Sequence, residues 1–229
     1  MMTSSSNQKE AGLVVVACRV MGPELETVLQ AAQGVEIRYL DQALHRTPQR
    51  MTSLIQAEID RASLSAKQIV LGYGLCSNGI VGIVAGEQGL IVPRCHDCIA
   101  FFLGSPSKYQ EAFRARPGTY YLTPGWVAEK KDPLGIIEEY TPRLGRETAI
   151  WVMEEELKHY THIALIHTGV ADLGTVRERA MENAQFLKKA YQEIQGGLDY
   201  FRKLVLGPYD DEDFLIITPR QQVTQEMFF

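Results

Sequence analysis

Long hydrophobic runs, positive charge and cysteine are all scarce in this 229-residue chain. No apolar stretch approaches the roughly 20 residues that a helix needs to cross a bilayer. The polar segment from Met1 to Glu10 lacks the hydrophobic core of an export signal. Lys and Arg number 23 against 28 Asp and Glu, and this net charge of -5 argues against a broad nucleic-acid-binding face. We therefore expect a cytoplasmic protein that acts on neither membranes nor nucleic acids.

Only four cysteines are present. Without a secretion signal, they are expected to be thiols or metal ligands rather than a disulfide framework. A chain with 45% hydrophobic and 22% charged residues has an ordinary globular composition. No repeat or clear linker divides it. We expect a disordered, Ser-rich tail over residues 1–11 and a single α/β domain over residues 12–229.

Apolar runs alternate with helical patterns along the chain. The uninterrupted run Leu13–Ala17 is typical of a strand that is covered on both faces. The alternation predicts parallel βαβ units and a mostly parallel, doubly wound, Rossmann-like sheet, with a division into two α/β lobes near residue 130 as the alternative to one undivided unit. The expected strands are residues 13–17, 35–40, 68–74, 90–93, 119–123, 162–167 and 213–218. The expected helices are residues 22–32, 48–59 with Thr47 as N-cap, 80–85, 99–103, 106–116, 147–160 and 175–195.

Four chemically versatile residues, Cys18, His45, Cys76 and Cys98, each follow a predicted strand. Ligands of open parallel sheets bind outside the carboxyl ends of the strands, so these side chains are expected to gather there. Three thiolates and an imidazole suit zinc or an iron–sulfur cluster, and Cys95 is an alternative ligand. The competing interpretation is that each cysteine is a small buried hydrophobic residue.

The segment Cys95-His96-Asp97-Cys98 also has the C-x-x-C spacing of redox motifs. Asp97 could instead cap the helix expected at residues 99–103. The polar side chains of Arg94, His96 and Asp97 also suit anion binding or acid–base chemistry.

Small residues around Cys76 would let backbone amides approach a cofactor closely. These candidates are Gly74, Asn78 and Gly79, and a second set, Thr168 and Gly169, follows another strand. Tight turns explain both sets equally well. The aromatic residues Tyr120, Tyr121 and Trp126 are interpreted as core or pocket wall.

Five segments carry a resemblance to a known family: ACRVMGPELE, LHRTPQRM, GYGLCSNG, PRCHDCIAFFLGSPSKY and GTYYLTPGW. On these segments the chain resembles an uncharacterised bacterial and archaeal family known as domain of unknown function sixteen thirty-eight, over nearly all its length beyond the tail. Cys95 is the doubtful ligand in this resemblance. The resemblance implies an association with corrinoid-dependent methyl transfer, although the chain lacks the Asp-x-His-x-x-Gly signature of proteins that ligate cobalt through histidine. Matching family positions are Cys18, His45, Cys76, Arg94, Asp97 and Cys98.

Our leading hypothesis is a metal-dependent enzyme or accessory protein in one-carbon metabolism. His45 would be the fourth ligand or a general base, Arg94 would bind an anionic group, and Asp97 would orient a ligand or transfer a proton. The ligands of zinc or an iron–sulfur cluster would be Cys18, Cys76, Cys98 and His45.

Two alternatives stay open. One is a noncatalytic module that holds a corrinoid or another small ligand, or delivers a metal, for a methyltransferase partner. The other is a thiol redox protein that uses Cys95 and Cys98. The expected partners are a small-molecule ligand and a corrinoid protein or methyltransferase, and a homodimer is the default assembly for such a fold.

Overall fold

The computed structural model describes residues 12–46, 48–170 and 172–229, so the expected tail over residues 1–11 and the expected N-cap Thr47 lie outside it. The first of two sheets has the strand order β2-β1-β3-β4-β8. Strands β1 to β4 are parallel and β8 is antiparallel to β4. The strands are β1 (Leu13–Cys18), β2 (Val35–Leu40), β3 (Gln68–Gly72), β4 (Leu90–Pro93) and β8 (Phe214–Ile217).

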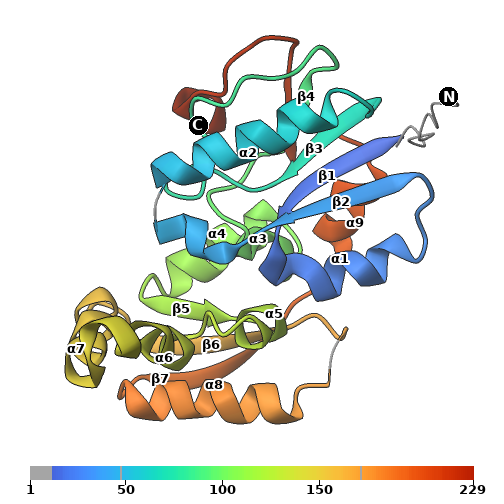
Figure 1. Ribbon diagram of the computed structural model, residues 1–229. Coiled ribbons are helices and arrows are strands. Elements are labelled where there is room, and N and C mark those ends of the chain that lie inside the picture. Colours follow the sequence, from blue (N-terminus) through green and yellow to red (C-terminus); the bar gives the residue numbers. More distant parts are fainter. Residues whose placement is uncertain (1–11, 47, 171) are drawn as a thin grey trace, which may run out of the picture.

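The second sheet is smaller and wholly parallel, with the order β5-β6-β7. Its strands are β5 (Thr119–Leu122), β6 (His162–His167) and β7 (Ala190–Gln195). The chain enters this sheet at β5 and returns to the first sheet with β8, so the first and the last strand both belong to the first sheet. The protein is therefore an α/β protein with mostly parallel, Rossmann-like sheets, and its two sheets lie in separate parts of the molecule, the β5-β6-β7 sheet below the first sheet in Figure 1.

Helices connect and cover the strands of both sheets (Figure 1). The helices that lie next to the first sheet or between the two sheets are α1 (Gly22–Leu29), α2 (Pro48–Ala62), α3 (Ile99–Leu103), α4 (Pro106–Ala115), α5 (Pro124–Ala128) and α9 (Asp199–Leu206). Those of the second sheet are α6 (Pro133–Leu144), α7 (Arg146–Glu156) and α8 (Gly174–Phe186). Short 3-10 helices are η1 (Arg19–Met21), η2 (Gln42–Arg46) and η3 (Gln225–Phe228). Within the described part of the chain, the helices are too short or too polar to cross a membrane.

Two sequence-based expectations about elements were wrong. The long helix expected over residues 175–195 is instead α8 followed by β7, because the chain turns at Lys188, whose φ of 54° is left-handed. Residues 80–85 form turns rather than a helix, since Gly82 has a φ of 94° and Val84 bridges to Gln222 near the C-terminus.

The two sheets meet around Phe102 of α3, which is fully buried. Its ring lies 5.5 Å from that of Trp126 and 5.1 Å from that of Phe201, both in edge-to-face geometry. Its carbonyl accepts a hydrogen bond of 3.0 Å from the N–H of Gly197, which follows β7. A Cβ on Gly125 would lie 1.8 Å from the carbonyl oxygen of Val20, so glycine is needed where α5 meets η1. These contacts fix the relative position of the sheets.

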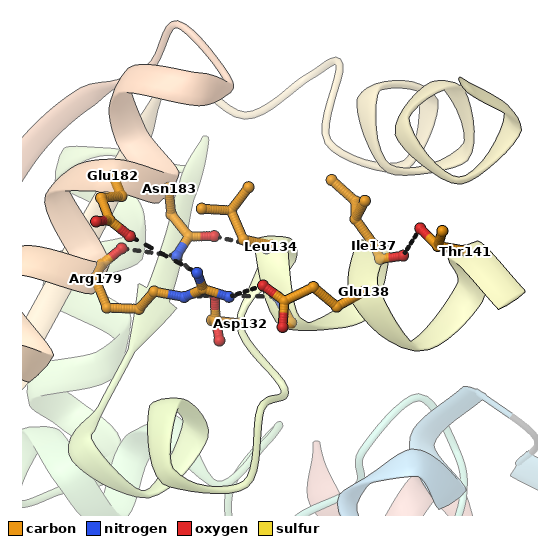
Figure 2. Close-up of polar contacts among 9 residues, drawn as sticks. Asp132, Leu134, Ile137, Glu138, Thr141, Arg179, Glu182 and Asn183 are labelled. Carbon is orange, nitrogen blue, oxygen red and sulfur yellow. Dashed lines mark hydrogen bonds and ion pairs between the residues drawn. The ribbon is translucent and has the colours of Figure 1, made fainter. Parts of the chain in front are cut away.

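A buried ion-pair network holds α6 against α8 (Figure 2). The carboxyl of Asp132, only 1% exposed, accepts from Arg179 Nε at 2.9 Å and from Asn183 Nδ2 at 2.7 Å. Asn183 Oδ1 in turn accepts from the N–H of Leu134 at 2.8 Å. Arg179 also reaches the exposed carboxylate of Glu138 at 3.0 Å. The network positions α6, whose Ile136 lines a cavity described below.

Candidate functional site

Cys18, Cys76 and Cys98 lie at the carboxyl edge of the first sheet. Cys18 ends β1, Cys76 lies in the turn after β3, and Cys98 follows β4 and immediately precedes α3. All three side chains are buried and none forms a disulfide. The parallel register brings these strand ends to one edge, as the sequence predicts.

The thiols of these cysteines lie within electrostatic range of one another. Burial raises the pKa of the Cys18 thiol to about 12, although a hydrogen bond with the backbone N–H of Val20 acts to lower it. Burial also raises the pKa values of Cys76 and Cys98, and negative charge on neighbouring cysteines raises both further. Without a bound cation, the thiols are therefore protonated at neutral pH.

The turn that carries Cys76 has a strained backbone. Cys76, Ser77 and Asn78 have φ values of 46°, 55° and 67°, so three consecutive non-glycine residues adopt the left-handed conformation. This conformation costs about 1–2 kcal/mol per residue for side chains other than glycine. The turn is held by hydrogen bonds from Leu75 N to Cys95 O at 2.9 Å and from Cys76 N to His96 O at 2.8 Å. Strain of this kind is typical of functional sites.

His45 lies in η2, just after β2, close to the buried Tyr73. Their ring centroids are 6.2 Å apart. Burial lowers the pKa of His45, which favours the neutral imidazole. His45 Nε2 has no hydrogen-bond partner among the described residues, whereas the Tyr73 hydroxyl interacts with the Cys18 thiol and acts to lower its pKa. An unpartnered buried polar atom is costly, so His45 Nε2 is a candidate for contact with a ligand.

Asp97 is fixed by two hydrogen bonds beside Cys98. Its Oδ1 accepts from Ile99 N at 2.9 Å, and its Oδ2 accepts from the Tyr109 hydroxyl at 2.8 Å. Burial raises the pKa of Asp97 despite these bonds. The first bond links Asp97 to the first residue of α3, whose N-cap is Cys98 rather than the expected Asp97. The second adds a tyrosine on α4 that the sequence analysis did not assign to the site.

Two adjoining cavities open beside these residues. The thiol cavity, of about 550 Å³, includes Cys76, Ser77, His96 and Arg114 in its lining. The aromatic cavity, of about 390 Å³, includes Cys98 and Glu156. His45, Asp97, Tyr109 and Phe113 line both cavities, so these residues form the boundary between them. Both volumes are typical of small-molecule sites.

The wall of the aromatic cavity comes mostly from outside the first sheet. It is formed by side chains of α4, β5 and α5 and of the loop that precedes β6. Tyr120, Tyr121 and Trp126 line it, in agreement with their interpretation as pocket wall, whereas Tyr109 and Tyr160 were missed. The aromatic residues are Tyr109, Phe113, Tyr120, Tyr121, Trp126 and Tyr160.

Cys95 and Arg94 have other surroundings. Cys95 is buried beside Tyr200, and burial raises the pKa of its thiol. Arg94 donates from Nε to Asp211 O at 3.1 Å and from Nη1 to Met227 O at 3.0 Å, so its guanidinium holds the C-terminal segment. Arg94 and Cys95 line a separate cavity of about 150 Å³ together with His96 and Tyr109.

The glycines near Cys76 pack tightly in the structure. A Cβ on Gly74 would lie 2.6 Å from Cys95 O, and one on Gly79 would lie 2.6 Å from Met51 Sδ. Asn78 is exposed in the left-handed turn. Close packing within the protein therefore explains why both positions are occupied by glycine.

Thr168 and Gly169 follow β6 in the second sheet and line none of the cavities described above. Thr168 Oγ1 donates to Glu24 Oε1 on α1 at 2.8 Å. Glu24 is fully buried, and burial raises its pKa to about 7. Thr168 thus joins the two sheets through Glu24, a residue that the sequence analysis did not single out.

A metal site is not preformed in the described residues. Among them, no group of three or more His, Cys, Asp and Glu side chains is arranged to hold a metal ion. The donor chemistry fits zinc or an iron–sulfur cluster, whereas the present side-chain arrangement does not complete a coordination sphere.

The comparisons with known proteins identify the family. Residues 39–205 match the family model described as protein of unknown function, DUF1638. The chain belongs to this family. The match includes His45, Cys76, Asp97 and Cys98, but it begins after Cys18, so the family model covers less of the chain than the sequence resemblance suggests. No curated protein and no solved structure matches the chain.

Proposed function

We propose that this protein is a metal-dependent enzyme or accessory protein that acts on a small molecule in the paired cavities. Zinc or an iron–sulfur cluster would be held at the carboxyl edge of the first sheet by Cys18, Cys76, Cys98 and His45. The observation that carries this proposal is the buried, unpartnered Nε2 of His45, on a wall shared by both cavities that also include Cys76 and Cys98.

The state of the thiols supports a metal over thiol redox chemistry. The thiolate is the nucleophile in disulfide exchange, and burial raises the pKa of both Cys95 and Cys98. A metal cation would offset this cost, because coordination deprotonates a thiol outright. Binding would include reorientation of the donors, since few metal sites are fully formed without their ion.

The residues around the cavities have separate roles in this proposal. A bound metal would act as a Lewis acid or electron carrier. His45 would be a ligand or a base, and Asp97 would hold or accept a proton at Oδ2, where the Tyr109 hydroxyl positions it. The aromatic wall would exclude water from the ligand. A setting in corrinoid-linked methyl metabolism, beside a corrinoid protein or methyltransferase, comes from the family resemblance alone.

Metal content tests the proposal directly. Elemental analysis and a visible spectrum of protein purified without oxygen should show stoichiometric zinc or iron in the wild type. The metal should be lost in Cys18→Ala, Cys76→Ala and Cys98→Ala and kept in Cys95→Ala, the matched control. Wild-type protein without metal, also after anaerobic addition of zinc or of iron and sulfide, would refute the proposal.

The second candidate is a noncatalytic module that holds a small ligand for a partner. The cavity volumes favour this alternative as much as catalysis. Both candidates predict ligand binding, and they differ in whether His45→Ala and Asp97→Asn abolish turnover while the ligand still binds.

A further inference from the structure

We propose that the aromatic cavity binds a small organic cation, an alkylated ammonium group, through the faces of its aromatic side chains and the charges of Asp97 and Glu156. This inference rests on the proposed function only in taking the paired cavities as the ligand site. It names the chemical class of the ligand, which the family match leaves open.

The first argument is the composition of the wall. Six of the residues that line this cavity are aromatic, and they come from four separate segments of the chain. Tyr120 and Tyr160 meet nearly at right angles, with ring centroids 5.6 Å apart and an interplanar angle of 78°, and so form a corner. Aromatic faces attract a cation within about 6 Å of the ring centroid, and several faces around one ion form the cages that bind quaternary ammonium ligands.

The second argument is the sign of the charge. Asp97 and Glu156 line the cavity, and none of its described lining residues is a lysine or arginine. The positive charge of Arg116 acts to lower the pKa of Tyr121, but Arg116 does not line the cavity. Its side chain is exposed and donates a hydrogen bond to Gln192 on β7. An anionic ligand would meet two carboxyl groups here, whereas a cation would complement them.

The third argument is the orientation of the polar groups. The Tyr109 hydroxyl donates to Asp97 Oδ2 at 2.8 Å. Tyr109 therefore turns its oxygen toward this carboxyl group, while the aromatic residues of the wall contribute apolar ring surface to the cavity. This combination suits a ligand that carries positive charge on an apolar, alkylated group.

Tryptophan fluorescence gives a direct test, because the chain has only two tryptophans. Trp126 lines the cavity and Trp151 is 61% exposed, so the Trp151→Phe variant isolates the signal of Trp126. The probe is tetramethylammonium chloride, compared with tert-butanol as a neutral molecule of similar size, with ionic strength held constant by sodium chloride. We expect tetramethylammonium, and not tert-butanol, to change the fluorescence saturably.

Two pairs of variants locate the binding. Glu156→Gln should weaken binding about 2- to 5-fold, as expected for an exposed ion pair. Tyr160→Leu should weaken it about 10-fold or more, in line with the energy of a cation–π contact. The controls Glu154→Gln, on the same exposed end of α7, and Tyr191→Leu, on β7, should leave binding unchanged. Because Glu156 is exposed, its variant tests the proposal even if Tyr160→Leu does not fold.

The outcomes separate this inference from the metal proposal. Titrations of as-purified and chelator-treated protein, each with measured metal content, distinguish loss of metal from loss of cation binding. An equal response to tetramethylammonium and tert-butanol would overturn the inference in favour of a neutral apolar ligand. Absence of any response up to high millimolar concentration in the folded Trp151→Phe protein would also overturn it.

Discussion

Replacement of the buried Glu24 should make the protein more stable at alkaline pH. Glu24 lies in the first turn of α1 and is fully buried. Its Oε1 accepts from Thr168 at 2.8 Å, and its Oε2 has no hydrogen-bond partner among the described residues. Burial raises the pKa from 4.5 to about 7, although the hydrogen bond from Thr168 lowers it. The folded protein therefore favours the protonated, neutral carboxyl.

The sign and size of the effect follow from proton linkage. Because the pKa is higher in the folded than in the unfolded state, the folded state binds more protons between pH 4.5 and 7, and stability falls as the pH rises through this window. The full difference amounts to about 3 kcal/mol above pH 7. Glutamine is neutral at every pH and keeps the acceptor for Thr168. Glu24→Gln should thus exceed the wild type in unfolding free energy by about 3 kcal/mol at pH 8 and by little at pH 5.

Urea denaturation from pH 5 to pH 8 measures this difference. All other ionisable groups are the same in the two proteins, so their contributions to the pH dependence of stability cancel. The control is Glu26→Gln, an exposed position on the same helix, which should change the free energy of unfolding by less than about 0.5 kcal/mol. A difference between Glu24→Gln and wild type that does not vary with pH would refute the reasoning.

Three further changes test the packing around the site by urea or thermal denaturation. Asp132→Ala should cost about 3 kcal/mol because it leaves the buried amide of Asn183 without its acceptor and removes the N-cap of α6. The exposed Glu138→Ala should cost less than about 1 kcal/mol. Ser77→Gly should gain about 1 kcal/mol by relieving the left-handed backbone. Gly125→Ala should cost at least about 2 kcal/mol through overpacking, whereas Gly174→Ala, whose Cβ would have no neighbour closer than 3.8 Å, should be nearly neutral.

Each of these predictions has a contradicting result. Equal losses for Asp132→Ala and Glu138→Ala would show that burial of the network does not decide its strength. A loss of stability in Ser77→Gly would mean that the serine side chain outweighs the backbone strain. A neutral Gly125→Ala would mean that α5 can move away from η1 at little cost.

The strands of the first sheet were readable from the sequence because their signal is local. The runs Leu13–Cys18 and Gln68–Gly72 are apolar enough to be buried on both faces, and both are neighbouring strands of this sheet in the structure. A parallel ladder then requires that their carboxyl ends share an edge, and this places Cys18, Cys76 and Cys98 together without further information. The polar segment Ala190–Gln195 was missed, because an edge strand with half-exposed side chains has no such signal and continues the pattern of α8.

The sequence by itself determined the α/β class and the edge of the sheet at which the cysteines gather, since both depend on short-range apolar patterns and on strand direction. Only the tertiary structure decided what surrounds that edge. The ring of Phe102 joins the two sheets, Thr168 reaches Glu24 across 144 positions of the chain, and Tyr109 and Tyr160 reach one cavity from different segments. Such contacts depend on how the two sheets pack, and no local pattern records the partner of a buried side chain.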